Sequence, residues 1–333
     1  MSKKMTVQRI NDESLWNSFV STSPQGTVFS KSQWLNAAAG AQGGIPKYIG
    51  VFEDQKLAAG ITFVELSRGT FRKITTPVLT PYGGMIYRQD SGKRLSEQES
   101  FNMSCAEKIV EYLNPRYRYS FLVHSPGLTD VRPFTWAGWS EKVRYTYVLD
   151  LSDRDRIWDL MERRVRKVLR KAESILELGN TIDSGHFGGL YERIYLDRGN
   201  KPPVERKIVI ALLNNALQSG LAEIRTVHDA NGEIVSVLVV VSGDEKAYAW
   251  ISGSIPDRNS TGALSYLLWD SIQRYSETCA SFDLLGANLP TIAFFKKGFG
   301  GMLTPYYVTE RYSSLFSKAV YGVYGGLKKL RIS

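Results

Sequence analysis

The fold of this chain is decided by two neighbouring segments, Phe282-Asp283-Leu284-Leu285-Gly286-Ala287 and Phe294-Phe295-Lys296-Lys297-Gly298-Phe299-Gly300-Gly301. The first segment predicts an apolar strand that delivers one carboxylate to a Gly-Ala turn. The second predicts a short helix with lysines among aromatic residues and a glycine stop. Apolar surroundings penalise charge, so we expect Asp283 and Lys296 to keep their charges only by pairing or by acting on a substrate.

Length and composition are those of an ordinary globular protein with a basic surface. The 333 residues are long for one core, which predicts two domains. Charged residues make up 23% and apolar residues 43%, which leaves no room for large-scale disorder. The formal net charge of +9 favours an anionic partner, such as a nucleotide, CoA, tRNA or an acidic membrane face. A generally basic surface without a single partner is the alternative, and charge alone does not decide between the two.

The cysteines and histidines argue against several kinds of chemistry. Cys105 and Cys279 lie far apart in helical, apolar patterns, which predicts a reducing compartment and no disulfide framework. His124, His186 and His228 lack metal-ligand spacing, so we expect neither zinc catalysis nor a Ser-His-Asp arrangement. No apolar core follows the first five residues, and no run reaches the roughly 18 apolar residues of a spanning helix. We therefore expect a cytoplasmic protein without a signal peptide.

The hydrophobic pattern predicts a mixed α/β (α+β) chain that passes twice through a similar order of elements. In the first half, helices at 13–20 and 31–39 precede strands at 48–53, 57–66 and 73–79, a helix at 99–113 and a strand at 119–124. Asp54-Gln55 is the predicted hairpin turn between the first two strands. In the second half, the predicted elements are a strand at 145–151, helices at 154–178, 190–198 and 205–218, strands at 222–228, 233–241 and 246–252, a helix at 262–278, a strand at 282–285, a helix at 291–297 and a strand at 304–312.

The helix expected at 154–178 is the strongest electrostatic feature of the sequence. Its apolar stripe consists of Ile157, Leu160, Met161, Val165, Val168, Ala172 and Ile175. Its cations are Arg163, Arg166, Lys167, Arg170 and Lys171, with few acidic residues to neutralise them. We interpret the helix as a cradle for the phosphates of CoA, a nucleotide-linked sugar or tRNA. A solvated helix face is the alternative.

Several of these segments resemble one family. The order F-D-x-x-G-A, then F-K-x-x-F-G, is similar to the closing segment of the Fem-type peptidoglycan bridge transferases, and more so to related GNAT-like acyltransferases of bacterial polysaccharide and biotin-related gene neighbourhoods. Arg166–Ala172 resembles the R-x-x-x-x-K-A helix of this family, Phe29–Trp34 its F-x-S-x-x-W element and Pro77–Gly84 its P-x-x-x-x-Y-G-G turn. The resemblance implies acyl transfer onto an amine. It also implies two tandem GNAT-like units, each a mixed, mostly antiparallel sheet flanked by helices.

We therefore expect an N-terminal unit at 1–143, a C-terminal unit with the donor site at 144–312 and a basic tail at 313–333. The tail combines apolar and basic residues with three glycines. It is expected to pack on the N-terminal unit, and contact with an anionic membrane surface is the alternative.

The resemblance also implies roles for the residues of the opening segments. Lys296 matches the lysine of the F-K motif, and a fixed ammonium can stabilise the oxyanion that forms when an amine attacks a thioester or ester. Asp283 orients Lys296 by pairing, or accepts the proton of the amine. A lysine that stabilises the end of its own helix is the structural alternative, for which Lys297 is better placed.

Donor-binding residues are expected on the basic helix and in the loop Ser254–Ala263. In GNAT enzymes this loop holds the pyrophosphate of the donor through backbone N–H groups at a helix N-terminus. Arg166, Arg170, Arg258, Gly262 and Ala263 are the predicted donor contacts, although the spacing of the loop departs by one residue from the family pattern. An ordinary capped loop is the alternative.

Acceptor-binding residues are expected to be aromatic, with one arginine. Arg198 loosely matches the arginine of the family that binds the anionic group of the acceptor, and a cation at a helix C-terminus is its alternative role. The other predicted acceptor contacts are Tyr82, Tyr248, Trp250, Phe295 and Phe299, with core packing or closure of a turn as the alternative for the tyrosines and the tryptophan.

The sequence thus predicts an acyltransferase that moves an acyl group from an acyl-CoA-type thioester to an amine, on an amino sugar or peptidyl acceptor used in cell-envelope or exopolysaccharide synthesis. Acyl-CoA is the expected cosubstrate, with no tightly bound cofactor or metal and no DNA partner. A Fem-type aminoacyltransferase that uses charged tRNA is one alternative, although Leu35–Ala39 lacks the lysine that usually follows the tryptophan in that family. A non-catalytic GNAT-like scaffold is another alternative. We expect a cytoplasmic protein, with peripheral contact to the inner membrane face if the acceptor is lipid-linked.

Overall fold

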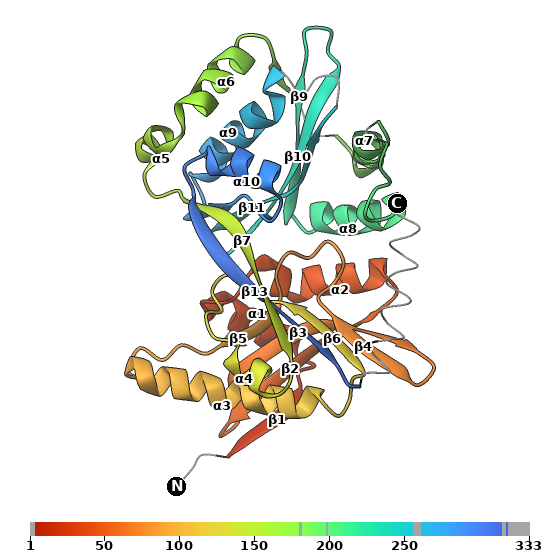
Figure 1. Ribbon diagram of the computed structural model, residues 1–333, viewed down its shortest axis with the longest axis vertical. Coiled ribbons are helices and arrows are strands. Elements are labelled where there is room, and N and C mark those ends of the chain that lie inside the picture. Colours follow the sequence, from red (N-terminus) through yellow and green to blue (C-terminus); the bar gives the residue numbers. More distant parts are fainter. Residues whose placement is uncertain (1–3, 180–181, 198, 256–260, 315–317, 319–333) are drawn as a thin grey trace. The chain divides into compact units, whose positions relative to one another are not determined.

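The computed structural model describes residues 4–179, 182–197, 199–255, 261–314 and 318. The chain divides into two compact units, one of the described residues up to Val143 together with those from Tyr306 onward, and one of Arg144–Pro305 (Figure 1). Both units are mixed α/β with mostly antiparallel strands, so the predicted fold class is confirmed.

The first unit combines two layers of helices with one sheet. Its elements are β1 (Met5–Arg9), α1 (Glu13–Thr22), a 3-10 turn (Val28–Ser30), α2 (Ser32–Ala41), β2 (Ile45–Glu53), β3 (Lys56–Arg68), β4 (Phe71–Thr75), β5 (Gly84–Tyr87), α3 (Leu95–Leu113), β6 (Tyr119–Val123) and α4 (Arg132–Trp136), with the start of β7 (Ser140–Asp150) and the end of β13 (Met302–Tyr312). The strand order is β1-β2-β3-β4-β6-β13, and β5 also pairs with β3. Only β4 and β6 run parallel in the described part of this sheet.

Two apolar clusters hold the first unit together. One packs α1 and α2 on the sheet around Trp16 and Leu35, and the other packs α3 and α4 around Ile109 and Phe134. These four side chains have at most 1% of their surface exposed. Their burial supplies the dominant favourable term for folding of the unit.

The second unit contains the predicted donor and catalytic segments. Its elements are the end of β7, α5 (Arg154–Leu160), α6 (Arg163–Glu173), β8 (Glu177–Gly179), α7 (Ser184–Leu196), α8 (Arg206–Gln218), β9 (Ala222–His228), β10 (Ile234–Gly243), β11 (Lys246–Ser254), α9 (Ala263–Tyr275), β12 (Ser281–Asp283), α10 (Pro290–Lys297) and the start of β13. The strand order is β7-β12-β11-β10-β9-β8, in which only β11 and β12 are parallel among the described pairs.

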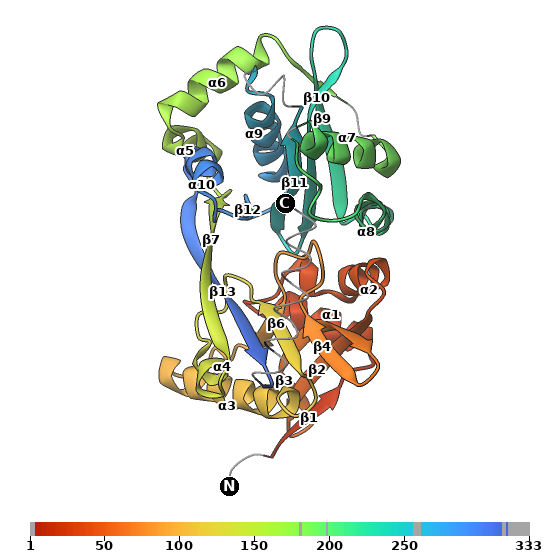
Figure 2. The same cartoon turned by 45° about the vertical axis from the view of Figure 1, so that its right-hand side comes forward.

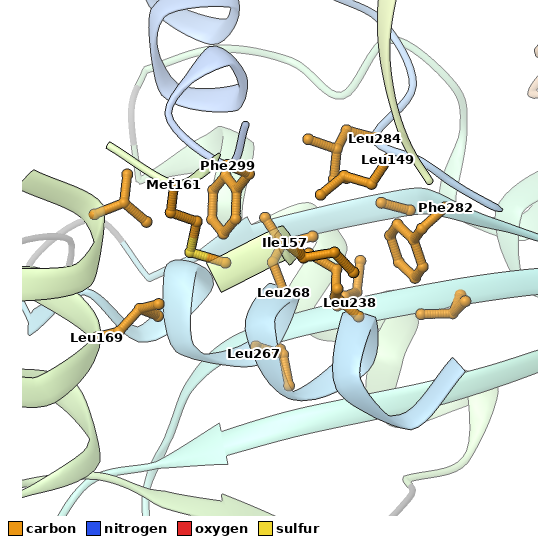
Figure 3. Packing of buried hydrophobic residues seen from close by; sticks show 14 of the residues in the cluster. Leu149, Ile157, Met161, Leu169, Leu238, Leu267, Leu268, Phe282, Leu284 and Phe299 are labelled. Atoms are coloured by element: carbon orange, nitrogen blue, oxygen red, sulfur yellow. The ribbon is translucent and has the colours of Figure 1, made fainter. Parts of the chain in front are cut away.

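The core of the second unit lies between its sheet and α9. Figures 1 and 2 show α5, α6, α9 and α10 on one face of β9–β11, and α7 and α8 on the other. Phe282 of β12, Leu267 of α9 and Phe299 are fully buried in one cluster (Figure 3). Phe299 follows α10 and anchors this helix to the cluster, which fixes the position of Lys296 three residues earlier.

One predicted element is wrong in its extent. The helix expected at 154–178 is two helices, because Met161 and Glu162 adopt extended backbone angles between α5 and α6. The N–H of Glu162 donates to the carbonyl of Gly298 instead of a helical partner, 2.9 Å away. Residues 177 and 178, predicted at the end of this helix, belong to strand β8 (Glu177–Gly179) on the edge of the sheet. Leu160, Val168 and Ile175, predicted in the apolar stripe, are exposed.

The boundary of the second unit also differs from the predicted 144–312. Val308–Tyr312 of β13 pair with β6, so the last part of this strand belongs to the first unit. The hairpin turn Asp54-Gln55 is confirmed, with φ of 46° and 69°. Cys105 is buried on α3, whereas Cys279 follows α9 outside any helix, and both are free thiols. Strands β1 and β5 and helix α4 are not predicted from the sequence.

Two kinds of feature are absent from the described residues. None of the helices there has the length and apolar character to cross a membrane. Nor does that part of the chain bring three or more His, Cys, Asp or Glu side chains together in a way that could hold a metal ion. The tail at 313–333 lies outside the described residues except for 313, 314 and 318, so its predicted packing stays a prediction.

Candidate active site

The predicted catalytic segment lies where two parallel strands diverge. Lys246–Tyr248 of β11 pair with Ser281–Asp283 of β12. β12 ends there, whereas β11 continues to Ser254. We call the end of this pairing, at Tyr248 and Asp283, the divergence point. Such a point exposes the side of a strand on which a ligand with amide groups can add hydrogen bonds.

A bulge in β11 follows the divergence point directly. Ile251 is opposite Val239 of β10 and Ala249 is opposite Val240, so Trp250 is an extra residue on β11. A bulge bends its strand and increases its twist, and bulges occur often beside active sites. The bulge therefore contributes to the separation of β11 from the chain that follows β12.

The turn after β12 is left-handed at two successive residues. Leu285 has φ of 51° and Gly286 has φ of 59°. The N–H of Leu285 donates to Oδ1 of Asp283 at 2.8 Å, and the N–H of Ala287 donates to the carbonyl of Tyr145 in β7 at 2.7 Å. A non-glycine residue such as Leu285 is strained in the left-handed backbone conformation, which persists only where the surrounding structure holds it. The chain thus leaves β11 but stays attached to β7.

Lys296 is the residue that holds this turn. Its ammonium donates to the carbonyls of Leu284 at 2.7 Å, Gly286 at 3.0 Å and Leu285. Burial lowers the pKa of Lys296 to about 8, and the charge of Asp283 opposes this shift. An ammonium has three N–H donors, so all three are occupied by main-chain carbonyls. The lysine is half-buried and bonded to the turn, and to reach an oxyanion it has to exchange one carbonyl for that oxygen.

Asp283 is fixed by two donors and is almost fully buried. Its side chain is 5% exposed, and Oδ1 accepts hydrogen bonds from the hydroxyl of Thr146 in β7 and from the N–H of Leu285. Its charge also acts on Lys296 across the turn. The predicted association of Asp283 with Lys296 is therefore an electrostatic interaction in the structure. Sequence analysis missed Thr146, because nothing in a residue 137 positions away signals that it reaches this carboxylate.

The predicted acceptor residues are mostly buried. Tyr248 is 3% exposed and Trp250 is 9% exposed, and burial together with the nearby Asp283 charge raises the pKa of Tyr248. Phe299 is fully buried, with its ring 5.5 Å from that of the half-buried Phe295. Phe299 therefore packs the core instead of lining an acceptor pocket, because no part of its surface is open to a ligand.

The remaining two acceptor predictions fall elsewhere. Tyr82, in the first unit, is 1% exposed and packs edge-on against Phe29 and Tyr306, so it closes the turn and does not face an open cleft. Arg198 lies outside the described residues.

Two of the predicted donor residues, Gly262 and Ala263, lie at the start of α9. Gly262 has φ of 79° and precedes α9, and a Cβ built on it lies 2.4 Å from Cγ1 of Val168 in α6. A glycine is therefore required here both for the backbone conformation and for the close approach of α6. The N–H of Ala263 donates to the hydroxyl of Thr261 at 3.3 Å. Arg258 lies outside the described residues.

Helix α6 is the basic helix, and its Val168 lies beside Gly262 at the start of α9. It carries six basic residues and one acidic residue, at Arg163, Arg164, Arg166, Lys167, Arg170, Lys171 and Glu173. Arg166 is half-buried, and Arg170 is exposed with its guanidinium 5.9 Å from the ring centroid of Trp158. Positive charge beside a helix N-terminus favours an anion such as a phosphate. Sequence analysis did not single out Arg164, which lies over the Phe294 ring and donates to the Phe294 carbonyl, so it ties α6 to α10.

Comparisons with known proteins agree with this geometry. Residues 140–297 match the acetyltransferase (GNAT) domain family. The fold is similar to that of FemX, with a TM-score of 0.68 and 12% identity over 91% of this chain and 96% of that one. It is also similar to L-PGS from Bacillus licheniformis, with a TM-score of 0.52 and 12% identity over 91% and 93% of the two chains. A comparison with curated proteins gave no match.

A third similar structure is a tandem GNAT protein from the clavulanic acid biosynthesis pathway, with a TM-score of 0.50 and 10% identity over 93% of this chain and 99% of that one. Together these likenesses establish a tandem GNAT-like fold over nine tenths of the chain. Residues 140–297, which make up most of the second unit, match this acetyltransferase domain model, and the predictions of a GNAT-like fold and of an acyltransferase are confirmed.

Proposed function

We propose that the protein transfers an acyl group from a CoA-type thioester to a primary amine, on an amino sugar or peptidyl acceptor of cell-envelope or exopolysaccharide synthesis. The observation that carries this proposal is the divergence of β11 and β12 beside a bulge and a lysine-held turn. The GNAT domain match supports the reaction class. The acyl chain, the acceptor and the pathway are proposals from the sequence resemblance.

Donor binding uses the start of α9 and the cations of α6. The phosphates of the donor lie at the helix N-terminus after Gly262, where backbone N–H groups and the helix dipole favour negative charge. Arg166 and Arg170 add positive charge from α6, and Arg170 leaves its place over Trp158 to do so. The pantetheine amides then pair with β11 beyond Tyr248, which brings the thioester to the divergence point.

The chemical step is attack of a neutral amine on the thioester carbonyl. The C–N bond forms as the C–S bond breaks, the thiolate leaves with the CoA, and the proton of the amine passes through water to solvent or to the thiolate. Lys296 exchanges one of its carbonyl partners for the developing oxyanion, a stabilisation typically of a few kcal/mol. Asp283 keeps the ammonium charged and in place, since its own charge favours the protonated lysine.

Acceptor binding is assigned to the neighbourhood of Trp250 and Phe295, with Arg198 for an anionic group of the acceptor. A cytoplasmic location with peripheral contact to the inner membrane face fits a lipid-linked acceptor. This part of the proposal depends on the basic tail, which is outside the described residues.

A coupled assay tests the proposal. The purified protein is incubated with acetyl-CoA or longer acyl-CoA thioesters and a panel of amines that includes glucosamine, and thiol release and product mass are measured. Acyl-CoA is expected to raise the melting temperature, and one amine is expected to release thiol. Absence of both effects, together with salt-sensitive retention of aminoacyl-tRNA, would instead support the tRNA-dependent alternative. Binding of acceptors without any response to acyl donors would support a non-catalytic scaffold.

A further inference from the structure

One cleft of the second unit lies between α5 and α9. It is lined from α5 by Asp155, Trp158 and Asp159 and from α9 by Trp269, Gln273 and Ser276, and has a volume of about 550 Å³. We call it the tryptophan cleft. Gln273 follows Gly262 by eleven positions on α9, which places it about 16 Å along the helix from the donor-binding end. None of the six residues has a role in the proposed acyl transfer.

The two indole rings are the main apolar surface of the tryptophan cleft. Their ring centroids are 5.4 Å apart at an interplanar angle of 46°, so the rings form a tilted pair and not a closed stack. Both tryptophans are half-buried, with Ile157 and Ile272 beneath them in the core. A tilted aromatic pair that stays open to solvent offers ring faces to a ligand.

Two carboxylates stand beside these rings without a counter-charge. Asp155 and Asp159 are exposed and one helical turn apart on α5. Within the described residues, neither carboxylate has an ion-pair partner, although this protein has an excess of nine positive charges. Two carboxylates and two aromatic faces on the same cleft form an environment that favours a positive charge over a neutral group.

A cation of the protein itself already uses one of these rings. The guanidinium of Arg170 lies 5.9 Å from the ring centroid of Trp158. Arg170 does not line the tryptophan cleft, so it does not fill the volume between the two helices. The contact shows that the Trp158 ring is placed to interact with a cation.

We propose that the tryptophan cleft binds a small organic cation, a ligand with an ammonium group on an aliphatic or sugar body. The ammonium lies against the indole faces of Trp158 and Trp269 and between the carboxylates of Asp155 and Asp159. Gln273 and Ser276 hydrogen-bond the polar body of the ligand. The volume fits a molecule of this size, since small-molecule sites typically measure about 300–1,000 Å³. The proposal does not require acyl transfer, and the site touches the proposed donor residues only where Arg170 lies over Trp158.

Isothermal titration of the full-length protein with choline tests the proposal, with 3,3-dimethylbutan-1-ol as a neutral probe of the same shape. Choline is expected to bind saturably, and the neutral probe about tenfold more weakly, because only the charged probe interacts with the ring faces and carboxylates. Equal binding of the two probes would reduce the cleft to an apolar pocket and overturn the proposal. So would the absence of saturation up to about 10 mM choline.

Two variants locate the binding. Trp269→Leu is expected to abolish choline binding, and Trp136→Leu is the matched control, since Trp136 is a 63% exposed tryptophan of the first unit with Arg132 over its ring. Asp155→Asn combined with Asp159→Asn keeps the shape of the cleft and is expected to weaken choline binding about tenfold while thiol release from acyl-CoA is unchanged. Unchanged choline affinity in this double variant places the ligand elsewhere and contradicts the proposal, whether or not Trp269→Leu folds.

Discussion

The two units share a parallel strand pair of three residues but treat its end differently. In the first unit, Lys73–Thr75 of β4 pair with Tyr119–Phe121 of β6, and in the second unit β11 and β12 pair over the same length. Beyond the pair, the first unit continues the ladder. The Thr76 N–H donates to the Phe121 carbonyl, the Val123 N–H donates to the Thr76 hydroxyl, and the Gly83 N–H donates to the Val123 carbonyl, all at 2.8 Å.

The polar side chain at the end of each strand pair differs in charge, and it follows the strand in the first unit but comes from α10 in the second. In the first unit, His124 is fully buried: its Nδ1 accepts from the Met85 N–H at 3.4 Å, and its Nε2 lies 2.9 Å from the Thr309 hydroxyl. Burial lowers the pKa of His124 to about 3, so this imidazole is neutral. In the second unit, the ammonium of Lys296 holds a turn that leads the chain away from β11. The end of the β4–β6 pair thus lies beside a neutral imidazole, whereas the chain after the β11–β12 pair is held away from β11 by an ammonium.

The two ends differ in what they offer to a ligand. A closed ladder leaves no strand side for a ligand, whereas a divergent pair does. A neutral imidazole buried among hydrogen bonds stabilises the fold, and a buried ammonium costs stability unless its charge has a use.

The largest effect is expected from Lys296→Met. The variant removes the three bonds to the turn and the charge proposed for the oxyanion, so kcat is expected to fall about 100-fold or more while the KM for acyl-CoA changes little. Lys297→Met is the matched control, because Lys297 is the exposed neighbour on the same helix and its loss is expected to leave kcat nearly unchanged. Equal kcat in the two variants rules out the catalytic role of Lys296.

The pH dependence of the rate separates a catalytic role of Lys296 from a role in holding the turn alone. The rate is expected to fall above about pH 8, where the ammonium loses its proton. The stability changes in the opposite direction. Lys296 binds its proton less well in the folded state, so its contribution to the free energy of unfolding rises as pH increases from about 8 towards the ordinary lysine range. A pH–rate profile and thermal unfolding between pH 7 and 10, with Lys296→Met as the reference, measure the two trends. A wild-type rate that is flat across this range contradicts a required ammonium.

His124→Phe tests the end of the β4–β6 pair in the first unit. The variant is expected to lower the free energy of unfolding by about 2–3 kcal/mol at neutral pH, because it leaves the Met85 N–H and the Thr309 hydroxyl without their partner. The pKa of His124 is lowered to about 3, so its stabilising contribution is present above the ordinary histidine range and is lost as pH falls from about 6.5 towards 3. Urea unfolding at pH 7 and pH 4.5 is expected to show a steeper loss of stability for the wild type than for the variant. Identical pH dependence in both proteins means that the imidazole is not the titrating group.

How much of this contrast the sequence predicts depends on the range of each interaction. Asp283 and Lys296 stand out locally, because a charge in an apolar segment carries its own signal. The Asp54-Gln55 hairpin and most of the strands are also local patterns and are confirmed. The break at Met161–Glu162 is invisible in the sequence, since the hydrophobic period continues through it and the cause is a bond to Gly298, more than 130 residues away.

The same reasoning explains the candidate residues that the sequence misplaced. Phe299 and Tyr82 belong to motifs that the resemblance links to substrates, yet tertiary packing buries both side chains. Thr146 and the β11 bulge at Trp250 contribute to the candidate site only through cross-strand register, which a single sequence does not encode locally.

Gly262→Val is expected to have an intermediate effect. A Cβ at this position lies 2.4 Å from Val168, and φ of 79° is unfavourable for a β-branched residue. We therefore expect the free energy of unfolding to fall by about 2–3 kcal/mol and the KM for acyl-CoA to rise clearly. Gly220→Val is the matched control, since Gly220 has φ of 67° with open space around its Cβ position. Thermal unfolding and donor titration of both variants separate backbone strain from the contact between α6 and α9. Equal donor KM values in the two variants contradict a donor site at the start of α9.

The smallest effect is expected for single cations of α6. Arg166→Gln and Arg170→Gln each remove one exposed or half-exposed charge, and such charges typically contribute about 0.5–1 kcal/mol, so the KM for acyl-CoA is expected to rise about two- to fivefold with kcat unchanged. A donor without the 3′-phosphate of CoA sharpens the test, because a side chain that binds this phosphate has no effect on the truncated donor. If Arg170→Gln raises the KM of both donors equally, Arg170 acts through its contact with Trp158 or through general charge. Arg170 then does not bind the 3′-phosphate, and α6 is a solvated helix face at this position.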